Sequence, residues 1–387
     1  MPLSKIQFRP GINKEGTNYS NEGGFFSCDK VRFRSGYPEK IGGWTRVTAT
    51  AFVGTCRSMW NWITLASVNI LGFGTTKKYY LEVGGTLNDI TPLRPFTTTG
   101  TYAQTASTTV TVTVVSTATM QSTDTVSLCF TSGTAPNANY VITVLDGTTF
   151  TVVSANSTTT SGAVNISQLA VKLTNPFTTN TTAGTENIVT VTHASHGALD
   201  GDYVTFTSVG AAVGGIAAAT LTAEFIITWV SGNAYKITAA TNATSIATGG
   251  GTVVAKYQIN TGLDTYVAGL GWGSGPWNDL GTAWGQSATS GPGGQLRLWT
   301  QDNFGEDEII APRGAPMYYW SASTPYVYNR AVLLNDEATA QGYAGNFVPN
   351  STNQVMSSGL QRFVIAFGAN SYLSTNAATS FDPMLVR

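Results

Sequence analysis

The sequence contains few charged residues, because Lys, Arg, Asp and Glu together make up 11% of its 387 residues. A typical soluble domain carries about 25%. The formal net charge is −1, which argues against a protein whose main task is gripping nucleic acid. A surface this poor in charge is typical of a chain that is covered by partner subunits or built from Thr, Ser and Asn.

Cysteine is also scarce, and the three present, Cys28, Cys56 and Cys129, are odd in number and far apart. They imply no disulfide framework. The opening stretch 1–5 lacks the apolar core of a secretory signal, and the apolar run at 60–63 is far shorter than a membrane span. We therefore expect a protein without a membrane span that is made and assembled in a reducing cytoplasm.

The charges that are present are unevenly placed. Residues 1–96 hold 12 Lys/Arg and 6 Asp/Glu, residues 97–256 hold 3 and 6, and the remainder hold 5 and 9. A basic head on a neutral-to-acidic body indicates directional docking to an acidic neighbour. Ordinary scatter of charge is the alternative.

Strand patterns dominate the chain, and almost nothing has helical periodicity. Short runs alternate apolar and polar residues between turn residues, as in 110–114, where valines and threonines take opposite faces. β-Branched side chains, which are stiff at χ1, suit a pleated surface. The sequence therefore predicts an all-β fold.

Composition distinguishes three kinds of segment, and together with an internal duplication of the middle one they predict five parts. A basic docking segment at 1–50 is followed by a Trp- and Tyr-rich part at 51–96. A Thr-, Ala- and Val-rich insertion then forms two domains, 97–175 and 176–256. The aromatic-rich character returns at 257–387.

One hairpin pattern occurs three times in the aromatic-rich parts, at 70–80, 309–320 and 364–372. Each copy has an apolar strand, a glycine turn expected to supply positive φ, and an aromatic segment. Three copies predict the blades of a β-propeller platform, and three unrelated hairpins in a sandwich are the alternative. The turn glycines are Gly74, Gly314 and Gly368.

The insertion is internally duplicated. Residues 124–128 match 202–206, and 140–150 match 225–235. The second pair is further apart in sequence, which places a longer loop in the second copy, at 210–215. Each copy is expected to be a small β-sandwich or barrel, inserted as a pair into the propeller.

Two histidines, His193 and His196, are the only ones in the chain. As a metal pair they lack cysteine companions and the H-E-x-x-H pattern, and on a strand they would face opposite sides. A turn at the mouth of the second insert domain is the favoured interpretation.

Four acids, Asp302, Glu306, Asp307 and Glu308, lie close together in sequence. Paired carboxylates can hydrolyse glycosides, but they need a cleft and separated pKa values, which proximity in sequence does not supply. Solvated turn acids or salt-bridge partners between subunits are favoured.

The stretch 271–276 has a G-x-G pattern without the helix that a phosphate cradle requires. The same glycine-rich region contains Trp272, Trp277 and Trp284. They could stack sugars, but packing at subunit interfaces is favoured.

A basic strand is expected near residue 30. Lys30, Arg32 and Arg34 would share one face, while Val31 and Phe33 would pack on the other. The cations would meet DNA phosphates or the carboxylates of an adjacent ring, with solvated edge protection as the alternative.

The N-terminal residues resemble the signature of tail nozzle or tail hub proteins of short-tailed bacteriophages. The stretches that carry the resemblance are 8–13 (Phe-Arg-Pro-Gly-Ile-Asn), 19–24 (Tyr-Ser-Asn-Glu-Gly-Gly) and 28–44, from Cys28 to Trp44. Stretches of the aromatic-rich parts are similar to the same family: 57–60 with 74–75, and 302–307 leading into 312–314. The match covers 1–94 and about 295–387, and the Thr-rich middle is similar only to generic phage insertion modules.

This resemblance implies a β-propeller platform repeated about six times in a ring below the portal and adaptor rings. The ring would surround the DNA-exit channel of the virion tail, help to retain packaged DNA, touch it transiently, and adjoin fibre or needle proteins. Members of the family usually continue past the position of Arg387, so the platform would be finished by further chain or by a neighbour. The expected docking residues are Lys30, Arg32, Arg34 and Trp44, and the expected turn-motif residues are Gly74, Gly314, Gly368, Asp302, Gly305, Glu306, Asp307 and Arg313.

We therefore predict a structural virion protein, assembled in the bacterial host cytoplasm, with no enzymatic activity, cofactor or metal. A heterologous ring contact would explain the low charge and high aromatic content. A receptor- or carbohydrate-binding tail adhesin is the alternative function. A polysaccharide-degrading tail enzyme that uses Asp302 or Glu306 is a further alternative.

Overall fold

The computed structural model describes residues 9–17, 19–43, 45–260, 298–322, 329–343, 348–370 and 381–387. The chain divides into two compact units, Met1–Ala49 and Thr50–Arg387. Several sequence expectations fall outside the described residues: Trp44, the stretch 271–276, and the tryptophans Trp272, Trp277 and Trp284.

The described residues confirm the all-β prediction. Their only helices are two short ones, α1 (Ala218–Leu221) and α2 (Leu334–Ala340), and the rest of the regular structure is strand. None of the described helices has the length and apolar character needed to cross a membrane. The cysteines Cys28, Cys56 and Cys129 are free thiols.

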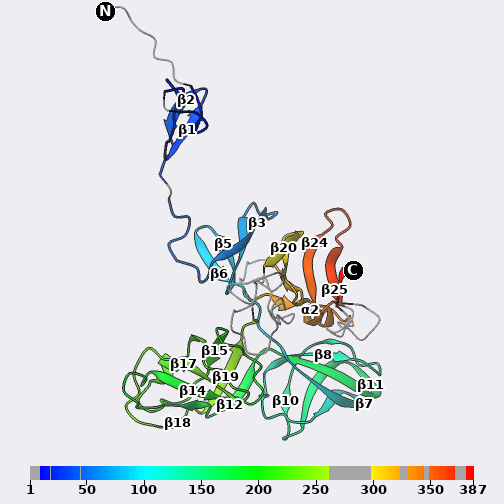
Figure 1. The fold of residues 1–387 in the computed structure, drawn as a ribbon. Helices are drawn as coiled ribbons and strands as arrows, with labels where there is room; N and C mark the ends of the chain where they lie inside the picture. The colour runs from blue at the N-terminus through cyan, green and yellow to red at the C-terminus, as the bar shows by residue number, and fades with distance from the viewer. Residues whose placement is uncertain are drawn as a thin grey trace, which may run out of the picture. The chain divides into compact units, whose positions relative to one another are not determined.

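The first unit contains one hairpin, formed by β1 (Val31–Arg34) and β2 (Tyr37–Lys40) (Figure 1). Ser35 and Gly36 link the strands with φ of 49° and 83°, the positive pair that a tight two-residue hairpin turn requires. Among the described residues up to Ala49, Asn21 alone is buried. The described residues of this unit therefore form a hairpin but no hydrophobic core.

The second unit contains three antiparallel sheets, each with its strands in chain order, which we call the first, second and third platform sheets. The first consists of β3 (Cys56–Ile63), β4 (Asn69–Thr75), β5 (Tyr79–Val83) and β6 (Thr86–Asp89). The second consists of β20 (Trp299–Phe304), β21 (Asp307–Pro312), β22 (Tyr318–Trp320) and β23 (Val332–Leu333). The third consists of β24 (Thr352–Ser357), β25 (Val364–Asn370) and β26 (Phe381–Val386).

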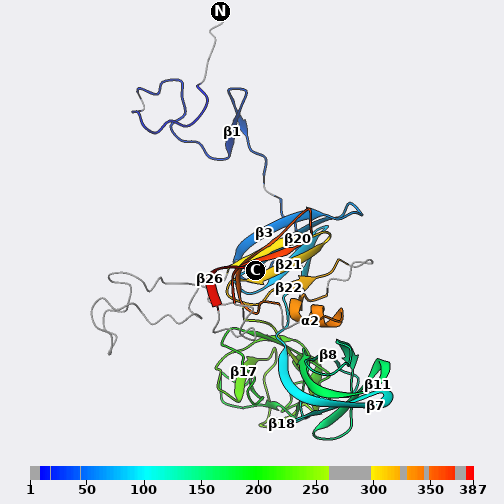
Figure 2. The same cartoon turned by 90° about the vertical axis from the view of Figure 1, so that its right-hand side faces the viewer.

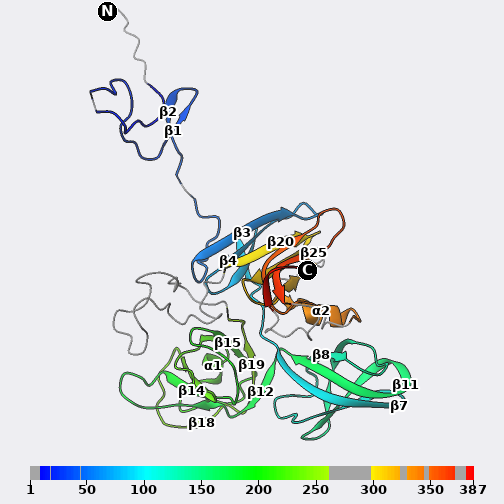
Figure 3. The same cartoon turned by 45° about the vertical axis from the view of Figure 1, so that its right-hand side comes forward.

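The three platform sheets pack face to face (Figure 3). Successive residues of a strand point to opposite faces, so Ile310 packs against the first sheet while Ile309 and Ala311 pack against the third. The first strands of the three sheets contact one another in series, β3 with β20 and β20 with β24. This is blade-like packing, and the described residues form a stack of three sheets rather than a closed propeller.

The three repeated hairpin segments of the sequence supply the second and third strands of the platform sheets, as far as the described residues reach. Gly314 has φ of +72° in a turn, and Gly368 has φ of +56° at a bulge in β25. The expectation for Gly74 was wrong, because this residue lies inside β4 and its φ is not positive. A Cβ at Gly74 would lie 2.3 Å from Cδ1 of Trp299, so glycine is required there for space.

The two ends of the insertion lie side by side where they join the platform. Leu93 bridges Gln258 in antiparallel fashion, and the Arg94 N–H donates to the Tyr257 carbonyl at 2.8 Å. The platform segments on either side of the insertion are therefore neighbours in space.

The first insert domain is one strongly bent sheet whose two longest strands pair with each other (Figure 2). Val110, Val112 and Val114 are buried in its core, as their alternation with threonine predicted. Its strands are β7 (Phe96–Val114), β8 (Thr125–Phe130), β9 (Ala138–Val141), β10 (Thr143–Val144) and β11 (Thr149–Gln168).

The second insert domain has two four-stranded sheets around a separate core. One sheet contains β12 (Val171–Thr174), β15 (Tyr203–Thr207), β16 (Glu224–Ile226) and β19 (Thr252–Tyr257). The other contains β13 (Phe177–Thr178), β14 (Ile188–Thr192), β17 (Ala234–Thr238) and β18 (Thr248–Gly249).

The two insert domains share one pairing register, although their strands are divided differently. The equivalent pairs are Val126–Tyr140 with Val204–Phe225, Phe150–Val112 with Tyr235–Val191, and Thr151–Thr143 with Lys236–Thr228. The extra residues of the second domain fall between β15 and β16, where the chain includes the glycine run 210–215 and α1. The second domain therefore has a longer loop but the same strand register as the first.

Candidate functional site

The sequence motif at 302–307 forms the turn between β20 and β21, and we call these six residues the junction turn. Gly305 has φ of +73°, which allows the chain to reverse there. The turn contacts all three platform sheets, so it brings together Asp302, Gly305, Glu306 and Asp307 of the expected turn motif.

Toward the first platform sheet, the junction turn makes three hydrogen bonds. Glu306 Oε1 accepts the Leu65 N–H at 2.5 Å, and the Glu306 carbonyl accepts the Trp62 indole N–H at 3.0 Å. The Trp60 indole N–H donates to Asn303 Oδ1 at 3.3 Å. The turn therefore fixes the end of β3 and the loop that follows it.

Toward the third platform sheet, Asp302 Oδ2 accepts the Ser357 N–H at 2.7 Å. The Arg362 guanidinium lies 5.9 Å from the centre of the Phe304 ring, and it would lie 2.8 Å from a Cβ at Gly305. Glycine at 305 therefore provides both the turn conformation and the room for this arginine.

Within the second sheet, Asp307 accepts the Tyr319 hydroxyl at 2.5 Å and the Ala322 N–H at 2.7 Å. Burial and this carboxylate raise the pKa of Tyr319. Asp302, Glu306 and Asp307 are partly exposed, as turn acids would be, but each also accepts a backbone N–H of its own chain, which the sequence did not predict. Their pairing between subunits stays a prediction. Their geometry is that of a structural joint.

Glu308 is fully buried between the first and second sheets, which the sequence interpretation missed. The Tyr79 hydroxyl donates to its Oε1 at 2.5 Å, and its Oε2 meets no hydrogen-bond partner among the described residues. Burial raises the pKa of Glu308 to about 8. The sequence feature that could have predicted its burial is its spacing from Ile310, because residues two apart on a strand share a face.

The remaining turn-motif residues, Arg313 and Gly314, lie between β21 and β22. Arg313 is exposed, and its backbone N–H donates to the Leu298 carbonyl at 2.8 Å. The Gly314 N–H donates to the Thr352 carbonyl of the third sheet at 2.7 Å. This turn is a second connection between the second and third sheets.

The basic hairpin of the first unit presents two cations on one face. Arg32 and Arg34 are exposed, whereas Val31 and Phe33 on the other face are half-buried. Arg32 pairs with Glu39 of β2 at 3.0 Å. Lys30 is exposed but precedes β1 with φ of 56°, so it lies outside the strand alternation that the sequence suggested.

The two histidines lie in the loop after β14 and are both buried, with ring centres 6.2 Å apart. The sequence favoured a turn for this segment, and the structure agrees, because both residues lie outside the strands. His193 Nδ1 lies 2.6 Å from the Tyr257 hydroxyl, and His196 Nε2 lies 2.7 Å from the Ser231 carbonyl. In the part of the chain that the structure describes, no group of three or more His, Cys, Asp or Glu residues could hold a metal ion.

We expect the second insert domain to lose stability as the pH falls from about 6.5 to about 4. Burial, His196 and Arg94 lower the pKa of His193 to about 4. An unfolded histidine takes up its proton near pH 6.5, so acid favours the unfolded state by up to about 3 kcal/mol. Hydrogen exchange of peptides covering β14, corrected for intrinsic rates, measures the loss. A His193→Gln variant with the same acid sensitivity would contradict it.

A partly buried charge network connects the second insert domain to the first platform sheet, and Lys78 is its buried member. The Lys78 ammonium contacts Asp89 at 2.8 Å and also pairs with Glu224 of β16. Arg330 pairs with Asp89 at 2.8 Å and with Glu224 at 3.4 Å. Two cations and two anions thus balance one another, and the buried Lys78 ammonium has two carboxylate partners, as a charge removed from water requires.

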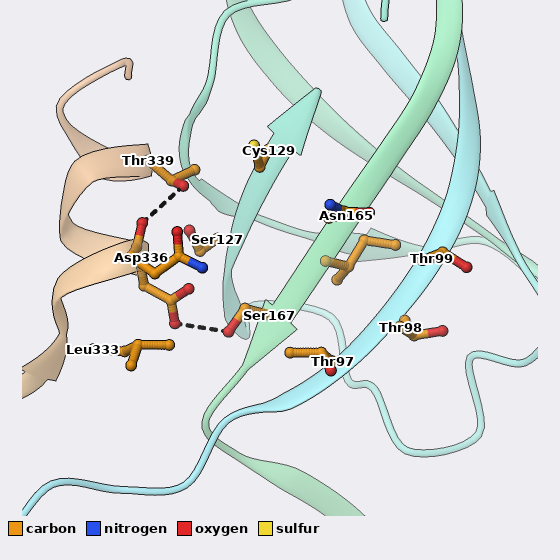
Figure 4. Close-up of a pocket in the computed structure, with 12 residues that line it drawn as sticks. Thr97, Thr98, Thr99, Ser127, Cys129, Asn165, Ser167, Leu333, Asp336 and Thr339 are labelled. Atoms are coloured by element: carbon orange, nitrogen blue, oxygen red, sulfur yellow. Dashed lines mark hydrogen bonds between the residues drawn. The ribbon is translucent and has the colours of Figure 1, made fainter. Parts of the chain in front are cut away.

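A cavity of about 330 Å³ lies between the first insert domain and α2 (Figure 4). Asp336 points from α2 to Ser167, whose hydroxyl it accepts at 2.7 Å, and burial raises the pKa of Asp336. The described residues that line the cavity include neither an aromatic ring that could stack a sugar nor a cation that could pair with an anion. The arrangement fits a joint between domains.

No family model matches the chain, and no curated protein matches it. Among solved structures, the phage phi92 endosialidase is similar, with 12% sequence identity and a TM-score of 0.20. The similarity covers 74% of this chain and 47% of that one, so this chain spans less than half of the endosialidase's length. At this TM-score the similarity establishes neither a shared fold nor a shared function.

Proposed function

We propose that this chain is a non-enzymatic structural protein of the tail of a short-tailed bacteriophage. Copies of it form a ring that continues the DNA-exit channel as a nozzle or hub and helps to retain packaged DNA. The platform sheets form the ring, and the basic N-terminal unit docks on a neighbouring copy.

The observation that carries the proposal is the exposure of apolar side chains in the N-terminal unit. The residues with the tail-nozzle signature lie in a segment that buries none of its described apolar side chains. Tyr19, Tyr37 and Val47 are among those left exposed. A backbone that is ordered without a core of its own is typical of an arm that completes its packing on a partner.

Charge complementarity supports a neighbouring copy as that partner. Residues 1–49 hold 8 Lys/Arg and 4 Asp/Glu, whereas residues 50–387 hold 12 and 17. The arm is therefore positive and the remainder of the chain is negative, so the arm of one copy is attracted to the body of another.

The roles of the acids also support a structural protein. The carboxylates that were candidates for glycoside hydrolysis, Asp302 and Glu306, are engaged by backbone N–H groups of adjacent sheets. Their hydrogen bonds fix the stacked sheets together. This use favours a rigid platform over a catalytic pair.

We expect the double substitution Arg32→Glu with Arg34→Glu to weaken self-association of the full-length protein at least tenfold. Reversal of both exposed cations replaces attraction to the acidic body by repulsion. Sedimentation velocity at low and high salt measures the change, and electron microscopy shows whether the wild-type copies close into rings.

The matched control is Lys14→Glu with Arg46→Glu, which makes the same change in charge at exposed positions outside the hairpin. It should weaken association less than the hairpin variant does, and the difference between the two measures what Arg32 and Arg34 contribute beyond the net charge of residues 1–49. A wild-type chain that stays monomeric at micromolar concentration would overturn the proposal. Specific binding on a glycan array would favour the adhesin alternative.

A further inference from the structure

The two outer sheets of the platform stack each have one packed face and one face turned away from the stack. On β3, Trp62 packs toward the second sheet, while Met59 and Ile63 on the opposite face are 62% and 68% exposed. The centre of this outward face is covered by Phe52, whose ring lies 5.2 Å from that of Phe73. The exposed apolar strip therefore runs along β3, the edge strand of its sheet.

The third platform sheet has a corresponding strip. Val355 and Ala366 pack toward the second sheet, and the neighbouring residues therefore point outward. Met356 on β24 is 43% exposed, and Val386 on β26 is 58% exposed. β24 is the edge strand of this sheet, as β3 is of the first.

We propose that the outward face of the third platform sheet in one copy packs against the outward face of the first platform sheet in the next copy. β24 of one copy then lies beside β3 of its neighbour. This interface is the contact by which the copies associate. The inference rests on the proposed function, in which copies of the chain form a ring.

The occupant is a second copy because the contact continues packing that the chain already contains. Within one chain, β3 contacts β20 and β20 contacts β24, each time with apolar side chains between the sheets. If this series of contacts continues, the next strand to pack against β24 is the first strand of another platform sheet. β3 of the next copy is such a strand. The same step covers both exposed strips.

The contact is head-to-tail, because the two faces differ and belong to opposite ends of the stack. Head-to-tail contacts leave one free face of each kind at the end of every oligomer, so they propagate until a ring closes. A symmetric contact between two identical faces would instead stop at a dimer. The two possibilities give different outcomes when blocked copies are mixed.

The test uses two full-length variants, Met59→Glu and Met356→Glu, each of which buries a charge in the proposed contact. Each variant alone is expected to be monomeric. A mixture is expected to give one dimer, because the Met59→Glu copy keeps an intact third sheet and the Met356→Glu copy keeps an intact first sheet. Native mass spectrometry and sedimentation velocity distinguish monomer, dimer and ring.

The matched control is Val153→Glu, a change at a 72% exposed residue of the first insert domain, and it should leave assembly unchanged. Rings formed by either Met variant alone would overturn the interface while leaving the proposed function standing. A mixture that stays monomeric would overturn the head-to-tail arrangement. A wild-type chain that is itself monomeric would remove both proposals.

Discussion

Replacing Glu308 with Gln is expected to raise the free energy of unfolding at pH 8 by about 2–4 kcal/mol and to flatten its dependence on pH. The carboxyl group of Glu308 is fully buried, and its pKa lies at about 8 in the folded protein. An exposed glutamate in the unfolded chain ionises near pH 4.3. The folded state therefore keeps a proton that the unfolded state releases.

The direction of the pH dependence follows from that difference. Below about pH 4 both states are protonated and Glu308 makes no pH-dependent contribution. As the pH rises toward 8, ionisation favours the unfolded state by about 1.4 kcal/mol per pH unit, so stability declines. Glutamine stays neutral at every pH and can still accept the Tyr79 hydroxyl, so the variant lacks this decline.

Chemical denaturation of the full-length protein between pH 5 and pH 9 measures both profiles. Glu15→Gln is the control, because it makes the same chemical substitution at an exposed position in the other unit. Its profile should follow that of the wild-type protein. A Glu308→Gln variant that is less stable than the wild-type protein at pH 8 would contradict a protonated Glu308.

The parts of the fold that the sequence predicted are those that depend on local alternation. Val110, Val112 and Val114 alternate with threonines, and burial of one face follows directly from a period of two. The duplicated insert was visible for the same reason, because equivalent strands keep equivalent apolar positions. The pairing registers of the two domains then agree residue for residue across the shared strands.

The features that the sequence did not predict depend on contacts between distant segments. Glu308 lies in an acidic run, and only the packing of two sheets separated by the whole insertion buries it. The roles of Asp302 and Glu306 require backbone donors from the third and first sheets, Ser357 and Leu65. Local patterns contain no information about such partners, so the sequence predicted solvated turn acids or salt-bridge partners between subunits and did not predict these backbone hydrogen bonds.

Gly74 shows how a correct residue can be chosen for an incorrect reason. Its place before an aromatic strand suggested a turn with positive φ, but the structure needs glycine for the indole of Trp299. We expect Gly74→Ala to lower the free energy of unfolding by about 3 kcal/mol or more, since overpacking of a filled core forces strain. The indole cannot shift freely, because its N–H donates to the Thr75 carbonyl at 2.8 Å.

A double-mutant cycle with Trp299→Ala separates this steric cause from a conformational one. Removal of the indole is itself expected to cost about 3–5 kcal/mol, but Gly74→Ala should then cost less than about 1 kcal/mol, because the new methyl group enters the space left behind. Gly314→Ala is the matched comparison, since Gly314 has positive φ and open space, so about 1 kcal/mol of backbone strain is expected there whether or not Trp299 is present. Denaturant unfolding of the four proteins of the cycle measures the coupling. If Gly74→Ala costs the same with and without the indole, the contact between β4 and Trp299 is not what requires glycine at this position.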